Sequence, residues 1–155
     1  MGSTSDLPVM EKACRQLDEL QVPFEVNALS AHRTPEAVEQ FASQAEGRGI
    51  RVIIAAAGMA AALPGVIAAQ TTLPVIGVPI NATPLNGMDA LLSTVQMPSG
   101  VPVATMAVNG AKNAAVLAVE IFAVADQNLQ KKLADYRADM VKGVEAKAAK
   151  VKAQL

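Results

Sequence analysis

The sequence predicts a parallel, doubly wound β-sheet with helices on both faces. Short runs rich in β-branched residues alternate along the chain with segments whose apolar residues recur at helical spacing. The later runs are apolar on both faces, as expected for strands of a parallel sheet that helices cover from both sides. With 155 residues, 52% of them hydrophobic, the chain is long enough to bury the core of one such domain.

Four segments are predicted as strands because valine, isoleucine and small residues dominate them. They are Phe24–Ala28, Arg51–Ala56, Val75–Val78 and Val101–Met106. Each is separated from the next by a segment long enough for a helical crossover, and such connections join parallel strands.

Helices are predicted between these strands and after the last one. They span about Leu7–Leu20, Pro35–Arg48, Ala60–Ala69, Gly87–Val95 and Ala111–Ala125, followed by a final helix from Gln127. Thr34 is expected as the N-cap of the second helix, with Pro35 in its first turn. We interpret residues 1–155 as a single catalytic domain, in which about 126–150 form an amphipathic helix that packs on its own subunit or on a neighbour.

Composition excludes several classes of protein. The net charge is −1 and aromatic residues make up 3%, which argues against a nucleic-acid-binding protein. One cysteine, Cys14, and one histidine, His32, provide neither an internal disulfide nor a recognisable zinc site. The first residues show no basic and apolar leader, so a cytoplasmic protein is expected.

Charge is nearly absent from the middle of the chain, where Asp89 is the only charged residue between Val52 and Ala111. Residues Val52–Ala69 are apolar over the length of a membrane span, but alanine and glycine dominate them and Pro64 interrupts them. We therefore expect no membrane insertion and predict burial within the fold and between subunits.

Ligands of doubly wound sheets bind at the loops that follow the carboxyl ends of the strands, and two loops carry polar groups suited to this. Gly2–Asp6 precedes a helix and offers small residues, hydroxyls and free amides to a phosphate, although a serine or aspartate N-cap without a ligand fits equally well. In Ser30–Pro35, His32 is a candidate general acid–base and Arg33 a candidate partner of a phosphate or carboxylate. A capping or merely exposed histidine is the alternative.

Two further loops follow later strands. Ala57–Gly65 has almost no side-chain bulk, which suits either tight helix–sheet packing or a backbone-lined floor under a flat substrate. Asn81–Asp89 either closes a site or turns the chain, and Asp89 is expected to cap the helix that follows.

Several motifs together resemble the 5-(carboxyamino)imidazole ribonucleotide mutase family of purine biosynthesis, which includes the catalytic subunit of phosphoribosylaminoimidazole carboxylase. These motifs are Gly2–Asp6, Ser30–Pro35, Leu73–Pro79, Gln96–Thr105 and Ala111–Ala115. The resemblance covers nearly the whole chain. It implies a flavodoxin-like three-layer αβα sandwich assembled into a homo-octamer.

The resemblance also implies a reaction without cofactor or metal, in which a carboxylate moves as CO2 from the exocyclic nitrogen of a ribonucleotide to ring carbon C4. On this basis His32 transfers the proton. The positions that match the family's substrate-binding residues are Ser3, Ser5, Asp6, Ser30, Arg33, Gly58, Ala60 and Leu63. Arg33 is expected on the phosphate, Asp6 on the ribose, and Gly58 with its neighbours on the carboxylate and imidazole.

Departures from the family pattern keep alternatives open. Ala62 stands where the family usually has a histidine. The family's second class, the carboxylases that use CO2 directly, also lacks this histidine. Ala90 stands where the family usually has a serine. A non-catalytic nucleotide-binding homologue and a carboxylase of a different ribonucleotide are the other hypotheses. Family members also carry a strand of about six residues before the first loop. If the chain is complete, its sheet lacks a central strand; a start codon placed too late, or a sequence trimmed before Met1, is the simpler hypothesis.

Overall fold

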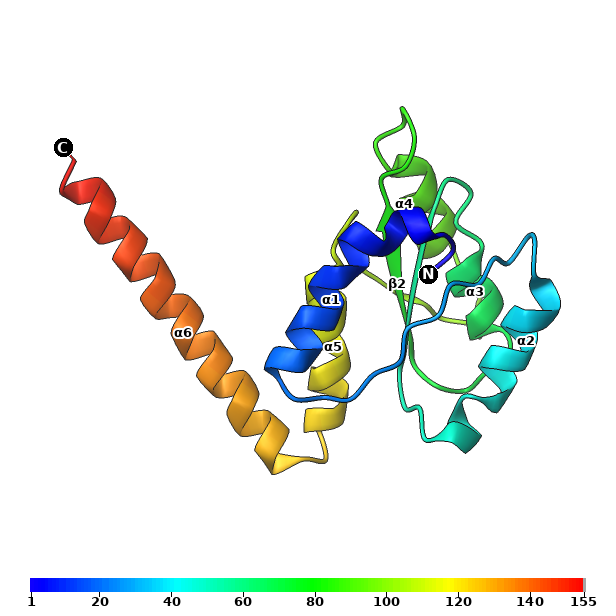
Figure 1. The fold of residues 1–155 in the computed structure, drawn as a ribbon, viewed down its shortest axis with the longest axis horizontal. Coiled ribbons are helices and arrows are strands. Elements are labelled where there is room, and N and C mark those ends of the chain that lie inside the picture. Colours follow the sequence, from blue (N-terminus) through cyan, green and yellow to red (C-terminus); the bar gives the residue numbers. More distant parts are fainter. Residues whose placement is uncertain (155) are drawn as a thin grey trace. The chain divides into compact units, whose positions relative to one another are not determined.

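The computed structural model describes residues 1–154, which divide into two compact units (Figure 1). The first unit, Met1–Ala118, contains the β-sheet and the loops at its end. The second unit begins at Val119, so the boundary falls within helix α5 (Ala111–Ala123). It contains the end of α5 and the long C-terminal helix.

The sheet is parallel, with its strands in chain order: β1 (Ile53–Gly58), β2 (Val75–Ile80) and β3 (Ala104–Thr105). The register pairs Ile53 with Val75 and Ile76 with Ala104. The predicted fold class is thereby confirmed. The last strand is shorter than predicted, because Pro102 has no amide hydrogen to donate to a ladder.

The prediction of a strand over Phe24–Ala28 is wrong, since this segment is not part of the ladder. Its backbone pairs with a neighbouring segment near its carboxyl end. The α-amino nitrogen of Met1 donates to the carbonyl oxygen of Asn27 at 2.8 Å, and the Leu29 N–H donates to the carbonyl oxygen of Met1 at 2.9 Å. A strand is assigned where a ladder of backbone hydrogen bonds forms, and these two bonds join the end of the segment to a single residue, Met1.

The helices of the first unit follow the predicted order. They are η1 (Thr4–Asp6), α1 (Leu7–Glu19), α2 (Pro35–Gln44), η2 (Glu46–Arg48), α3 (Leu63–Ala68) and α4 (Met88–Val95). Helix α3 begins three residues later than predicted, because Met59 has a positive φ of 59° and the chain turns there. No described helix has the length and apolarity that crossing a membrane requires.

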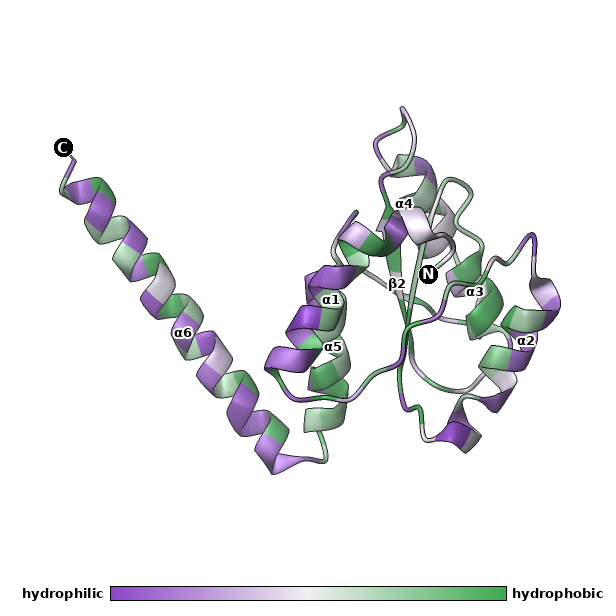
Figure 2. Cartoon of the chain, viewed as in Figure 1, coloured by the Kyte–Doolittle hydropathy of each residue, from purple (hydrophilic) through white to green (hydrophobic). Residues whose placement is uncertain are grey.

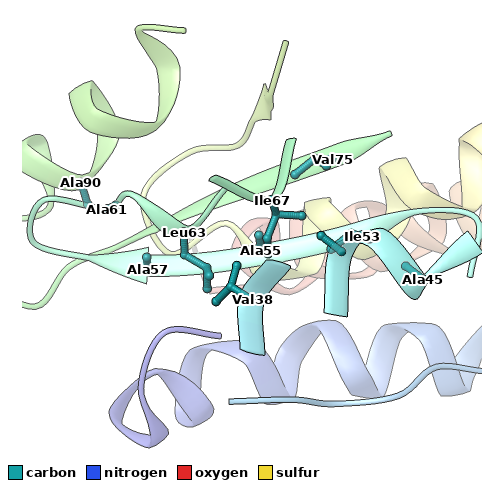
Figure 3. Packing of buried hydrophobic residues seen from close by; sticks show 11 residues of the cluster. Val38, Ala45, Ile53, Ala55, Ala57, Ala61, Leu63, Ile67, Val75 and Ala90 are labelled. Carbon is teal, nitrogen blue, oxygen red and sulfur yellow. The ribbon is translucent and has the colours of Figure 1, made fainter. Parts of the chain in front are cut away.

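One hydrophobic core cluster of the first unit lies between β1 and the helices α2 and α3 (Figure 3). Its buried members are Val38, Ala42, Ala45, Ile53, Ala55, Ala57, Ala61, Leu63, Ile67, Val75 and Ala90. So many alanines let helices approach the sheet closely. Gly77 of β2 shows how close, because a Cβ at this position would collide with Cγ2 of Thr94 in α4. This tight packing fixes the carboxyl ends of the strands, where the candidate site lies.

The second unit is dominated by α6 (Gln127–Lys152), in which hydrophilic and hydrophobic residues alternate (Figure 2). Asp126 caps the helix, because its carboxylate accepts the N–H groups of Asn128 and Leu129 at 2.8 and 3.2 Å. Among the apolar residues of this helix, Leu133 is buried, whereas Met140 and Val144 are exposed.

Candidate active site

Three of the predicted loops meet at the carboxyl end of β1. The N–H of Gly2 donates to the carbonyl oxygen of Ala56 at 2.9 Å, which places the first loop beside the end of this strand. The hydrogen bond from Leu29 to Met1 brings the loop that begins at Ser30 to the other side of the first loop. The arrangement therefore matches the location expected for a ligand of a doubly wound sheet.

The first loop is organised by reciprocal hydrogen bonds between Ser3 and Asp6. The Ser3 N–H donates to Oδ2 of Asp6 at 3.0 Å, and Oγ of Ser3 accepts the N–H of Ser5 at 3.2 Å. Asp6 is 3% exposed, and burial raises the pKa of its carboxyl group above the usual value. The Ser5 hydroxyl lies at the exposed surface of the loop and donates to Oγ of Ser3 at 2.9 Å. The loop thus combines the predicted cap with exposed hydroxyls that a ligand can reach.

His32 and Arg33 lie in an exposed turn that Ser30 holds together. Oγ of Ser30 accepts both the backbone N–H of Arg33 at 3.2 Å and its Nε–H at 3.3 Å. The guanidinium is thereby oriented through Nε. Within residues 1–154 the His32 ring has no hydrogen-bond partner, so both of its nitrogens are available to a substrate.

Thr34 occupies the predicted N-cap position of α2, but its side chain does not cap the helix. Its Oγ1 accepts the Ser30 N–H at 3.0 Å and donates to the Ser30 carbonyl oxygen at 3.1 Å. The predicted N-cap residue is thereby confirmed, while its hydroxyl closes the turn around His32 instead of accepting an N–H group of the helix.

The third loop presents mainly backbone, as the sequence suggested. Gly58 ends β1, Met59 turns the chain with a positive φ, and the Ala61 N–H donates to the carbonyl oxygen of Met59 at 2.9 Å. Ala60 is exposed at this turn, while Leu63 is 3% exposed and belongs to the core. Leu63 can therefore reach a ligand only through its backbone.

The loop from Asn81 to Asp89 borders the same region. Its Thr83 hydroxyl donates to Oδ2 of Asp89 at 3.0 Å, and the helix that follows is capped by Gly87, which has a φ of 82°. The expectation that Asp89 caps this helix is wrong: its carboxylate is used inside the loop.

Sequence reasoning missed Asn109, which fixes this loop from a distance. Oδ1 of Asn109 accepts the N–H of Asn81 at 3.0 Å, and the Asn109 N–H donates to the carbonyl oxygen of Pro79 at 2.8 Å. The signal that could have revealed it is the Asn109–Gly110 dipeptide, because asparagine before glycine favours the left-handed conformation that Asn109 adopts, with a φ of 59°.

The described loops bring together the groups needed for proton transfer on a phosphorylated substrate. The turn around His32 supplies an imidazole and a guanidinium, and the first loop supplies hydroxyls and a carboxyl group. The Gly58 loop adds backbone amides and almost no bulk, which suits a flat ring.

Comparison with known proteins connects this geometry to one family. The AIR carboxylase family model matches residues 1–143. The N5-carboxyaminoimidazole ribonucleotide mutase of Pyrococcus horikoshii is 58% identical over 148 residues, which cover 96% of this chain and 84% of that protein. A phosphoribosylaminoimidazole carboxylase of Candida glabrata is 52% identical over 151 residues, which cover 97% of this chain and 26% of that longer protein. The crystal structure of Treponema denticola PurE matches with a TM-score of 0.87 and 28% identity, covering 97% of this chain and 94% of that one.

Proposed function

Because the chain belongs to the AIR carboxylase family, we propose that it is a mutase that converts N5-carboxyaminoimidazole ribonucleotide to 4-carboxy-5-aminoimidazole ribonucleotide in purine biosynthesis. The observation that carries this assignment is the turn in which Ser30 orients Arg33 beside a free His32, next to the Ser3–Asp6 loop. A relative of 58% identity that bears the mutase name covers almost the whole chain.

The reaction moves one carboxylate and one proton. The bond between the exocyclic nitrogen and the carboxylate breaks to release CO2, and ring carbon C4 attacks that CO2 to form the new carbon–carbon bond. C4 loses its proton and the exocyclic nitrogen gains one. A single acid–base group that reaches both atoms can carry out both transfers, and such a group contributes roughly 10²–10⁴ in rate.

His32 is the residue we assign to this proton transfer, because its ring is exposed at the turn and has no described partner to occupy it. Arg33 binds the phosphate through the nitrogens that Ser30 leaves free. Ser3, Ser5 and Asp6 bind phosphate and ribose oxygens, and Gly58 and Ala60, with the backbone of Leu63, contact the imidazole and its carboxylate.

The CO2 released in the first step must stay beside C4 until it reacts. A site that excludes water and leaves no room for escape meets this need. The alanine-rich β1 and the loops packed against its end supply a lining with little polarity, and Ala82 lies directly against Gly58. We therefore assign the loop Asn81–Asp89 to the closure of the site.

One observation favours a second candidate, the direct carboxylation of aminoimidazole ribonucleotide by CO2. Ala62, at the N-terminal end of α3, stands where mutases usually have histidine, and relatives such as the Candida glabrata protein bear the carboxylase name. The two activities share the same product and differ in the substrate that leads to it.

A substrate comparison tests the proposal. Purified protein receives either the carboxyamino compound without bicarbonate, or aminoimidazole ribonucleotide with bicarbonate, both without ATP or added metal, and product is followed by its ultraviolet absorbance. We expect the first mixture to react at low substrate concentration and the second only at high bicarbonate. Reaction of the second mixture alone identifies a carboxylase. Binding without turnover in either mixture identifies a non-catalytic homologue.

We further propose a cytoplasmic homo-octamer, as expected from the sequence. Large apolar side chains are exposed on the first unit around α4: Met59, Leu85, Met88, Leu92 and Val95 are 46–63% exposed. Exposed apolar residues gathered in one region are typical of subunit contacts. Light scattering tests this, with an expected mass of about eight times the 16.0 kDa chain; a 16.0 kDa species contradicts it.

A further inference from the structure

The turn at residues 107–110 lies beside the carboxyl end of β2, where the loop Asn81–Asp89 begins. The Asn109 N–H donates to the carbonyl oxygen of Pro79, the residue before the last of β2, at 2.8 Å. The Gly110 N–H donates to the carbonyl oxygen at the start of the turn, also at 2.8 Å, and closes it. The turn is therefore fixed to the sheet next to the loop, which we call the closing loop.

The 107–110 turn contacts the closing loop at both of its ends. At the start, Oδ1 of Asn109 accepts the N–H of Asn81 at 3.0 Å. Near the far end, a Cβ on Gly87 would lie 2.6 Å from Cγ1 of Val108 and 3.3 Å from Cα of Asn81. The two ends of the closing loop thus lie against each other and against the same turn, as in a compact surface loop.

The start of the closing loop covers the end of β1. Ala82 lies directly against Gly58, and it follows the residue whose N–H Asn109 holds. The hydrogen bond from Asn81 to Asn109 therefore sets the position of Ala82 over Gly58. Because neither Ala82 nor Gly58 has a side chain beyond Cβ, the distance between loop and strand determines the width of the gap between them.

Asn109 combines two properties that its position uses. Its φ of 59° lies in the left-handed region, which asparagine, aspartate and glycine tolerate better than other residues. Its side chain adds the oxygen that accepts from Asn81. Glycine would satisfy the backbone alone, whereas aspartate would satisfy both the backbone and the acceptor.

We propose that Asn109 is a positioning residue that keeps the released CO2 in the site by holding the start of the closing loop against β1. This inference rests on the proposed function. When the bond between nitrogen and carboxylate breaks, its electron pair stays on the nitrogen, which takes up one proton, and CO2 is free. Retained CO2 is attacked by C4, which loses its proton, so the same carboxylate appears in the product. If that CO2 escapes, CO2 from solution takes its place.

Isotope exchange tests the proposal. The unlabelled carboxyamino compound is converted in the presence of labelled bicarbonate and carbonic anhydrase, and mass spectrometry gives the ratio of labelled to unlabelled product at early times. We expect this ratio to rise about fivefold in Asn109→Gly, which is the effect of one lost hydrogen bond on the balance between an open and a closed loop. In Asn109→Asp, which keeps the acceptor, we expect the ratio to stay within about twofold of that of the unaltered protein.

Gln21→Gly is the matched control, because it also introduces glycine at a positive φ, here 58°. Gln21 is exposed and follows the end of α1 opposite to the Ser3–Asp6 loop, so we expect an unchanged ratio. Melting temperatures of all variants are measured in parallel. A purely structural role of Asn109 lowers the melting temperature of Asn109→Gly without changing its ratio, and this result overturns the proposal.

The remaining outcomes are also decisive. An equal rise in Asn109→Gly and Asn109→Asp contradicts the role of the side-chain acceptor. If Asn109→Gly does not fold, Val108→Ala takes its place with the same expectation, because it loosens the contact with Gly87. If the unaltered protein forms no product from the carboxyamino compound, the proposed function fails and this inference fails with it. Product with an unchanged ratio in the folded variant contradicts this inference alone.

Discussion

Ala82 lies directly against Gly58, so that a Cβ built on Gly58 would be 2.7 Å from the Cβ of Ala82. Contacts between Cβ atoms are not that short, so Gly58→Ala must displace either the end of β1 or the loop from Asn81 to Asp89. We expect a loss of about 1–3 kcal/mol in the free energy of unfolding, together with reduced turnover. Thermal and urea unfolding measure the first effect, and the substrate assay the second.

Gly47→Ala is the matched control for that substitution, because a Cβ on Gly47 meets nothing within 4 Å. We expect its effect on the free energy of unfolding to stay within about 0.5 kcal/mol. Equal losses in the two variants would show that the close approach of Ala82 to Gly58 is unimportant.

Substitution of His32 by asparagine tests the proposed proton transfer. Asparagine can still form hydrogen bonds but does not exchange a proton near neutral pH, so we expect kcat to fall by about 10²–10⁴. Binding of the ribonucleotide should change little, because Arg33 and the first loop remain in place. Turnover in stopped-flow and affinity by calorimetry separate the two effects. Unchanged turnover would contradict the acid–base role of His32.

Replacement of Asp6 by asparagine should change the pH dependence of stability. Burial raises the pKa of Asp6, so the folded protein holds this proton more tightly than the unfolded chain does. Stability in the unaltered protein is therefore highest below the unfolded pKa and falls as pH rises through the window up to the raised folded pKa. Each unit by which the pKa is raised corresponds to about 1.4 kcal/mol.

The Asp6→Asn variant has no such group and should lack this loss. We expect its melting temperature to rise relative to that of the unaltered protein as the pH increases from about 4 to about 8, while its affinity for substrate falls. Melting curves across this range check the first expectation. A difference in melting temperature that does not vary with pH would contradict it.

Gln16 offers a stabilising substitution inside the fold. Its side chain is 1% exposed, and neither Oε1 nor Nε2 has a hydrogen-bond partner in the described part of the chain. Because burying an unpaired amide costs about 1–3 kcal/mol, Gln16→Met should raise the free energy of unfolding by a similar amount. The same substitution at the exposed Gln44 is the control and should have little effect. Urea unfolding distinguishes the two.

Most of the fold could be predicted because its elements carry local signals. Helix α1 begins at the predicted Leu7, and β2 begins at the predicted Val75. The segment Phe24–Ala28 shows the limit of such signals: its composition favours a strand, but a strand also needs a neighbour, and the neighbour is supplied by residues far away in the sequence. The predicted start of helix α3 was wrong for a related reason. Met59 has a positive φ, which the turn after β1 imposes on it.

The candidate site was predictable where single loops carry its chemistry, as in the turn of His32 and Arg33. The hydrogen bonds that hold these loops in place were not predictable. The contact between Asn81 and Asn109 joins residues 28 positions apart, and the bond from Thr83 to Asp89 depends on how one loop folds on itself. A motif identifies which groups are present, whereas only the packed chain shows which of them are already engaged.

The order of events during folding follows from the connectivity of the sheet. The parallel ladder joins Ile53 to Val75 and Ile76 to Ala104, so each pairing must close a long loop before it gains any contact. The C-terminal helix, in contrast, is built from contacts between near neighbours in sequence. We therefore expect α6 to gain helicity early and the β1–β2–β3 ladder to limit the folding rate. The residues proposed to hold the substrate are thus expected among the last to assemble.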